Sequence, residues 1–268
     1  MDTVNTPPRK SPLRWILLAV AVAVIAAGAF VWWFLKDDAP DEVSLENATE
    51  QISSTTAASS TATPSTAASG ESSTPETTAS AAPGDISGTW NVDTSVGEFS
   101  YTESTGTFVG FRVDEELAGI GSVTAVGRTP EVTGSLTIEG STLTAVEIVA
   151  NMAAITTDDS RRDGKVRSAL DVDQFPTATF TLTEPVDLGD AAASGAPFTG
   201  TALGNLTVHG VTKAVSIPIE AKVVNNAIVV VGSVEIVFAD YGVSVPSAPI
   251  VVSAEDRGPI EMQLFFTR

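Results

Sequence analysis

The chain has 268 residues, a formal net charge of -19 and no cysteine, which excludes disulfides, thiol nucleophiles and cysteine-based metal sites. From residue 85 onward there are 24 acidic and 10 basic residues, so this part alone carries a charge of about -14. Such a surface repels nucleic acid, and we expect no nucleic-acid partner.

The first apolar element is an uncharged run over residues 15–35. At about 32 Å it is long enough to cross the hydrocarbon core of a bilayer. Residues 1–14 before it are basic and acidic residues follow it, so the positive-inside rule places the N-terminus in the cytoplasm and the rest outside. We therefore predict a single-pass anchor in the cell membrane. A cleaved signal peptide is the alternative, but its only small-x-small site, Ala27-Gly28-Ala29, lies inside the apolar run.

The next segment, residues 36–84, is rich in Ser, Thr, Ala and Pro. Residues 51–80 alone contain 17 Ser or Thr and hardly any large apolar side chain. This composition does not offset the entropy of ordering, so we predict a disordered stalk, which is also a plausible target for O-glycosylation. A flexible chain of this length spans about 40 Å, enough to hold a domain away from the membrane.

Residues 85–268 have the composition of one folded domain, large enough to bury a core. Apolar and polar residues alternate in at least eight runs, which is typical of antiparallel strands in a sandwich or a closed barrel. Short helices are expected only around residues 158–172 and 241–250, and a hairpin is expected to turn at His209-Gly210. The runs include GTFVGFRVDEEL, EVTGSLTIEG, TAVEIVANMAAI, TATFTLTEPVDL, GNLTVHG, VTKAVSIPIEAKVV, AIVVVGSVEIVF and PIEMQLFFTR.

The sequence offers little for catalysis. His209 is the single histidine and lies in the expected turn, so nucleophile-base pairs and metal sites lack their usual members. We identify no catalytic residue, no metal site and no cofactor. The densest charge lies between residues 158 and 180, where Arg161, Arg162, Lys165 and Arg167 could bind a carboxylate or phosphate, or could fix a loop to the barrel rim.

This central stretch, SRRDGKVRSALDVDQFPTATF, resembles the signature of the YceI-like, or polyisoprenoid-binding, family. Three further motifs occur in the family's order: GTWNVD, GNLTVHGVTKAV and FADYGV. Lys165-Val166 stand where the family often has His-Leu, and Ala169-Leu170-Asp171 replace an aromatic segment. The resemblance covers residues 86–268. It implies an all-β fold, an elongated eight-stranded antiparallel lipocalin-like β-barrel, here preceded by one transmembrane helix and a disordered stalk.

The resemblance also implies an apolar channel that binds a long isoprenoid lipid, such as a polyprenyl lipid or an isoprenoid quinone. We expect Arg162, Asp163 and Arg167 to brace the rim or to meet a lipid headgroup, with bracing as the main role. The expected channel lining is Val109, Phe111, Val113, Leu136, Ile138, Phe175, Phe180, Leu182, Ile236 and Phe238.

Our leading hypothesis is a membrane-anchored, extracytoplasmic carrier for such a lipid. A stalked structural or interaction domain with a filled core is the first rival, and an enzyme of isoprenoid metabolism is the second. Small inward residues would indicate a cavity, and Ala125, Ala150, Ala153 and Ala178 point that way. Whether the barrel forms a homodimer stays open.

Overall fold

A computed structural model describes residues 39–50, 52, 85–102, 105–246 and 248–268. The predicted N-terminus, the predicted membrane span of residues 15–35 and most of the predicted stalk lie outside these ranges. Among the residues that are described, none belongs to a helix long and apolar enough to span a membrane.

Twelve strands of the described chain join in one sheet, and every pairing between them is antiparallel. The short helices are η1 (Met152–Ala154), α3 (Ser160–Ala169), α4 (Ala191–Ser194) and η2 (Phe238–Tyr241). The strands are β1 (Gly88–Val92), β2 (Phe108–Leu117), β3 (Gly121–Thr129), β4 (Val132–Glu139), β5 (Thr142–Asn151), β6 (Thr177–Leu182), β7 (Val186–Asp187), β8 (Phe198–Val208), β9 (Val211–Val224), β10 (Ala227–Val237), β11 (Val251–Ala254) and β12 (Arg257–Thr267).

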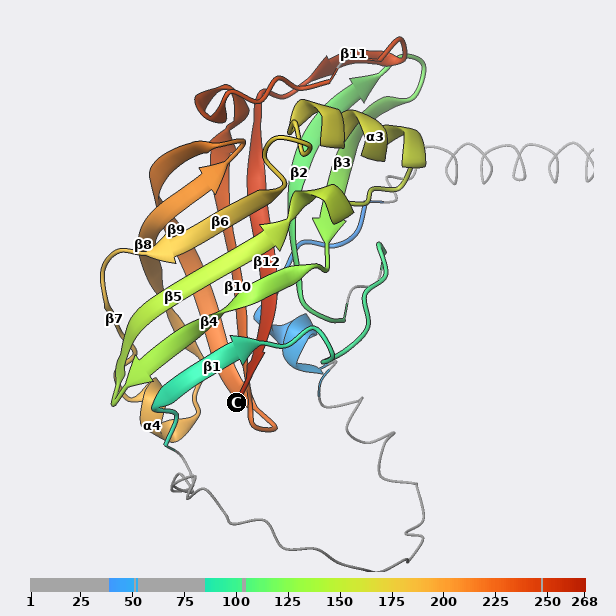
Figure 1. Cartoon of the computed structure of the whole chain (residues 1–268). Coiled ribbons are helices and arrows are strands. Elements are labelled where there is room, and N and C mark those ends of the chain that lie inside the picture. Colours follow the sequence, from blue (N-terminus) through green and yellow to red (C-terminus); the bar gives the residue numbers. More distant parts are fainter. Residues whose placement is uncertain (1–38, 51, 53–84, 103–104, 247) are drawn as a thin grey trace, which may run out of the picture.

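Eight strands form a closed ring in the order β1-β4-β5-β6-β8-β9-β10-β12. The ring closes where β12 pairs with β1, with Phe266 opposite Val92. β2 extends the sheet from the earlier half of β12, and β3 and β11 pair with β2. Figure 1 shows an elongated barrel with β11 and α3 at one end and α4 at the other. The predicted eight-stranded antiparallel barrel is therefore confirmed.

Alternation along each strand decides which side chains enter the barrel, because successive residues point to opposite faces. On β12, Leu264 and Phe266 belong to the main core cluster inside the barrel. Phe265 between them belongs to a second cluster on the outer face. Around Phe265 this strand is therefore apolar on both faces, and the full burial of Phe265 shows that its outer side is covered there.

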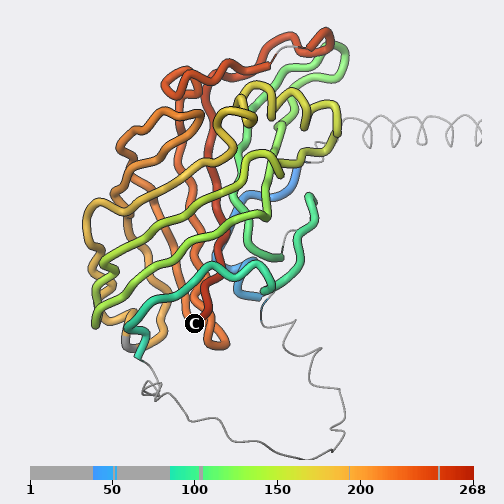
Figure 2. Tube along the Cα trace, viewed as in Figure 1, coloured from blue at the N-terminus to red at the C-terminus, as the bar shows by residue number. Residues whose placement is uncertain are grey.

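The outer face of β10 and β12 is covered by residues 39–52, which the sequence places in the disordered stalk. Residues 45–50 are helical. Leu45, Ala48 and Ile52 are buried in one cluster with Phe265 and with valines of β10. Figure 2 shows this blue segment against the red strand in the tube view. The beginning of the predicted stalk is thus packed against the barrel.

Two local predictions have different outcomes. The hairpin turn at His209-Gly210 forms between β8 and β9, with positive φ of 51° and 73°, which Gly210 adopts readily. The helix expected around residues 241–250 does not form, because η2 ends at Tyr241 and the described residues beyond it lack helical structure. Pro246 and Pro249 in that stretch have no N–H to donate to a helix.

Candidate lipid-binding cavity

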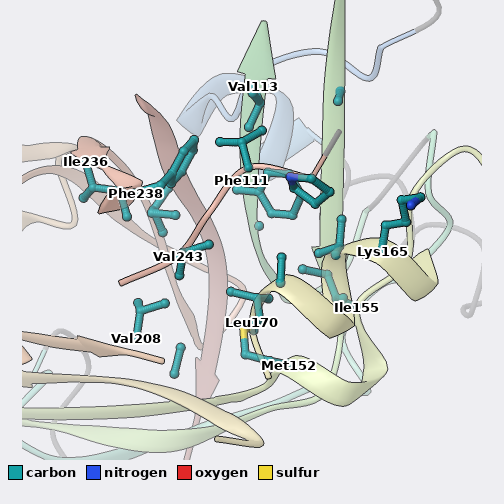
Figure 3. A pocket seen from close by; sticks show the side chains of 18 of the residues that line it. Phe111, Val113, Met152, Ile155, Lys165, Leu170, Val208, Ile236, Phe238 and Val243 are labelled. Carbon is teal, nitrogen blue, oxygen red and sulfur yellow. The ribbon is translucent and has the colours of Figure 1, made fainter. Parts of the chain in front are cut away.

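A cavity of about 560 Å³ lies inside the barrel. Inward side chains of β2, β5, β6, β8, β10 and β12 form its wall, and α3, Leu117 and residues 248–251 border one end, which we call the mouth. Figure 3 shows the labelled apolar side chains around this space, with Lys165 on α3 at its edge. The lining that argues most for an apolar ligand comprises Val109, Phe111, Val113, Met152, Ile155, Phe180, Val208, Ile236, Phe238 and Val243.

The lining of the cavity extends far along the barrel. Its lining runs along β2 from Val109 to Leu117, eight residue steps, which correspond to roughly 26 Å of strand. The volume lies within the range of about 300–1,000 Å³ that small-molecule sites occupy. The space therefore suits a narrow, extended ligand better than a compact one.

The charged residues of the lining gather near the mouth, on β2 and on or beside α3. They are Glu115, Asp159, Arg161, Arg162 and Lys165. Asp159 caps the N-terminus of α3 by accepting a hydrogen bond from the Arg161 N–H at 2.8 Å. Hydrogen bonds from the Arg161 side chain and backbone lower the pKa of Asp159 to about 2. The cavity thus combines an apolar interior with a charged entrance.

Arg162 joins α3 to the barrel wall. Its Nη2 lies 3.3 Å from Oε2 of Glu115 on β2, and its Nη1 donates to Asp158. Side-chain exposure is 24% for Arg162 and 10% for Glu115, so this pair is shielded more than an ordinary surface pair. Both partners of Arg162 are carboxylates of the protein itself, which supports bracing of the rim as its main task.

Asp163 and Arg167 also brace the rim. Oδ1 of Asp163 accepts hydrogen bonds from the backbone N–H and the hydroxyl of Thr157, both at 2.7 Å. Nη1 of Arg167 donates to the carbonyl of Ile155 at 3.3 Å. Neither side chain lines the cavity, whereas Ile155, which Arg167 holds, does. The contacts of all three predicted rim residues are therefore structural ones.

A second, smaller cavity of about 90 Å³ lies toward the end of the barrel that carries α4. Ile148, Phe180, Ile217 and Met262 line both cavities, so these four side chains separate them. An apolar chain that entered from the mouth would fill the main cavity and meet this constriction before it reached the second cavity. The two cavities together follow most of the barrel's length.

Apart from Phe175, the predicted lining residues divide into three groups. Leu136 and Ile138 line the second cavity. Leu182 packs against the core without lining either space. The remaining residues, apart from Phe175, line the main cavity: Val109, Phe111, Val113, Phe180, Ile236 and Phe238.

The expectation that Phe175 points toward a ligand is wrong. Its ring packs edge-on against His209 with centroids 5.0 Å apart, and it lines neither cavity. Phe175 closes a turn by donating its N–H to the carbonyl of Asp171 at 2.8 Å. β6 begins only at Thr177, so the alternation that directs Phe180 inward does not extend back to Phe175.

Sequence reasoning missed several lining residues. Val166 of α3 and Leu170 at its C-cap are four positions apart, a spacing that could have identified them. Met152 begins a single 3-10 turn and Ile155 follows it, and so short an element has no periodicity that could predict its inward face. Among the small residues expected to leave space, Ala125, Ala150 and Ala178 line the cavity, while Ala153 is exposed.

A closed antiparallel barrel around an apolar cavity, with charge confined to one end, defines a β-barrel binding domain. In the described residues, no cluster of three or more His, Asp or Glu could hold a metal ion. The chain belongs to the YceI-like family, because the model of the YceI-like domain matches residues 90–266. The resemblance inferred from the motifs is thus confirmed.

Curated relatives match part of this region. A UPF0312 protein of Vibrio vulnificus is 32% identical over 98 residues, which are 35% of this chain and 48% of the relative. A UPF0312 protein of Pseudomonas aeruginosa is 34% identical over 114 residues, 41% of this chain and 53% of the relative. The chain spans about half the length of the curated relatives it matches.

Two solved structures have a similar course of the chain. One is a polyisoprenoid binding domain from Saccharophagus degradans, with a TM-score of 0.48 and 19% identity, covering 60% of this chain and 93% of that one. The other is BcnA of Burkholderia cenocepacia, with a TM-score of 0.48 and 15% identity, covering 65% and 98%.

Proposed function

We propose that this protein binds a long isoprenoid lipid, a polyprenyl lipid or an isoprenoid quinone, in the main cavity. It would do so outside the cytoplasm while anchored in the cell membrane by residues 15–35. The observation that carries the proposal is the shape and chemistry of the cavity, which is about 560 Å³ in volume, elongated, apolar inside and charged only toward the mouth.

The energetics favour such a ligand. Each Å² of apolar ligand surface removed from water contributes about 25 cal/mol, so a chain enclosed along most of its length gains enough to leave water for the barrel. Phe111, Phe180 and Phe238 supply broad apolar surfaces for this contact. A carrier needs no chemistry beyond this burial.

The entrance supports a ligand with one polar end. Lys165 and Arg161 border the mouth, and the side chain of Arg161 is 89% exposed although it also binds Asp159. A phosphate or quinone headgroup could accept hydrogen bonds there while the apolar chain extends inward. Arg162 is less available, because Glu115 and Asp158 already engage it.

The test is to purify the full chain from membranes in mild detergent and to identify co-purified lipid by extraction and mass spectrometry. The delipidated protein is then offered polyprenols, isoprenoid quinones and straight-chain fatty alcohols of equal length. We expect isoprenoid lipid to co-purify and to be retained selectively. A protein that carries no lipid and takes up none of the three classes would overturn the proposal and favour an interaction domain without ligand.

A further inference from the structure

Residues 39–52 follow a defined path along the outside of the barrel. The carbonyl of Asp41 accepts hydrogen bonds from Nη2 of Arg128 at 2.8 Å and from Nη2 of Arg112. Both arginines also bind Glu261, at 2.9 and 2.8 Å, and all three side chains are at least nine-tenths buried. The guanidinium of Arg128 stacks on Phe108 at 4.4 Å. This cluster attaches the segment firmly at Asp41.

The segment runs from the mouth side of the barrel toward the other end. Glu261, level with Asp41, lies opposite Gly110, which lines the main cavity. Phe265, which packs with Leu45, Ala48 and Ile52, lies four residues further along β12, or about 13 Å away. In Figure 1 the blue segment accordingly rises beside β3 toward α3 as it is followed back from its helix. From Asp41 back to Ala39, the described chain therefore leads toward the mouth side of the barrel.

The number of residues between the predicted anchor and Asp41 limits how far the anchor can lie from the barrel. Six residue steps separate Leu35, the last residue of the apolar run, from Asp41, which allows at most about 21 Å. Along β2, the mouth at Leu117 lies five steps beyond Arg112, or about 17 Å. The chain between Leu35 and Asp41 is therefore long enough for the end of the anchor to lie at the level of the mouth.

The same path changes the role of the Ser- and Thr-rich residues 53–84. They connect Ile52, which is buried on the barrel, to residue 85 just before β1 of the same barrel. Their length adds nothing to the distance between barrel and membrane, because the connection to the anchor passes through Asp41. A spacer role would require the segment to lie between the anchor and the first packed residue.

The mouth carries apolar side chains with no cover in the described structure. Ile250 is 48% exposed and Val252 is 68% exposed, and Ile250 also lines the main cavity. β11, which contains Val252, pairs with the far end of β2 at Leu117. An exposed apolar tip at a cavity entrance fits an apolar partner surface.

We propose that the mouth docks on the bilayer that holds the anchor, with Ile250 and Val252 entering its interface and residues 39–52 fixing this orientation. The proposal rests on the anchor and the lipid binding proposed above. A lipid can then pass between bilayer and cavity without crossing water. The short tether and its direction favour the chain's own membrane over any other partner for this surface.

The absence of cysteine permits a direct test with single-cysteine variants of the full chain. Val252→Cys reports on the mouth and Thr89→Cys, exposed on β1 near the other end, is the control. Each is labelled with an environment-sensitive fluorophore and reconstituted in phosphatidylcholine nanodiscs with or without doxyl-labelled lipid. We expect the Val252→Cys probe to lose most of its emission to the doxyl quencher and the Thr89→Cys probe to lose little.

A second pair of variants tests whether residues 39–52 set the orientation. Ala48→Glu puts a carboxylate into the buried cluster on Phe265, while Asn47→Glu adds the same charge at an exposed neighbour. We expect quenching at position 252 to fall several-fold with Ala48→Glu and to persist with Asn47→Glu. Equal quenching of the probes at positions 252 and 89 would overturn the proposed orientation. So would quenching at position 252 that stays unchanged in the Ala48→Glu variant.

The remaining outcomes separate this inference from the proposed function. Protein that fails to float with vesicles contradicts the anchor and this inference together. Protein that floats, and whose Val252→Cys probe is quenched, but that yields no lipid by mass spectrometry, supports the docking surface and contradicts lipid binding. Protein that floats and carries lipid while its Val252→Cys probe stays unquenched contradicts the docking surface alone.

Discussion

Glu261 is the single side chain on which the outer face of the barrel most depends, since it neutralises both Arg112 and Arg128 in a buried site. Glu261→Gln leaves two buried guanidinium groups without a carboxylate. We expect a loss of about 3–5 kcal/mol in the free energy of unfolding, measured by denaturant titration. Arg161→Ala removes one exposed ion pair, so the loss in the free energy of unfolding should be far smaller. Similar small losses for both variants would contradict this account of the cluster.

The two tyrosines give a pH-dependent prediction. Burial raises the pKa of Tyr101 to about 12, with the charge of Asp158 adding to the effect, and burial also raises the pKa of Tyr241 above its ordinary value. Raised folded-state values mean that stability is complete below the unfolded pKa of 10 and declines as pH rises toward 12. Phenolate absorbance during alkaline titration should therefore lag behind that of the denatured chain. A tyrosine that ionises at its unfolded value in the intact fold would argue against these environments.

At the scale of elements, Ala150 of β5 and Ala178 of β6 lie directly opposite each other and both line the main cavity. Ala150→Leu and Ala178→Leu should reduce the lipid that co-purifies, because the new side chains occupy its space. Stability should stay equal or rise by about 1 kcal/mol, as is common when a cavity is filled. Ala145→Leu, at an exposed position of β5, is the matched control. Unchanged lipid content in the two cavity variants would contradict binding in this space.

The elements that could be predicted from the sequence are those with local signals. Alternation identified the faces of β2 and of β6, so Phe111 and Phe180 were assigned correctly to the interior. The His209-Gly210 turn could be predicted because its glycine lies between two alternating runs. Phe175 was misassigned because its turn interrupts the alternation just before β6, and Arg112 gave no signal because its partner Glu261 is 149 residues away.

At the scale of the whole molecule, composition separated the apolar run, the Ser- and Thr-rich segment and the barrel, but it set the barrel's start too late. Leu45, Ala48 and Ile52 are spaced as one face of a helix, yet the low-complexity sequence after them suggested that the entire region was disordered. Their burial depends on Phe265 at the far end of the chain. A contact between segments so far apart in the sequence cannot be predicted from local patterns, because it depends on how the strands of the barrel pair.

This packing leads to a prediction about where the folding unit begins. A chain of residues 85–268 loses the Asp41 carbonyl from Arg112 and Arg128 and exposes the apolar outer face at Phe265. Compared with residues 39–268, we expect a loss of about 2 kcal/mol, or about 4–8 °C in Tm for a domain of this size. Deleting residues 55–80 from the 39–268 chain is the control, since these residues only connect two segments that are held on the barrel. Equal Tm values for the 85–268 and 39–268 chains would mean that residues 39–52 do not hold to the barrel, and the proposed orientation of the mouth would lose its basis.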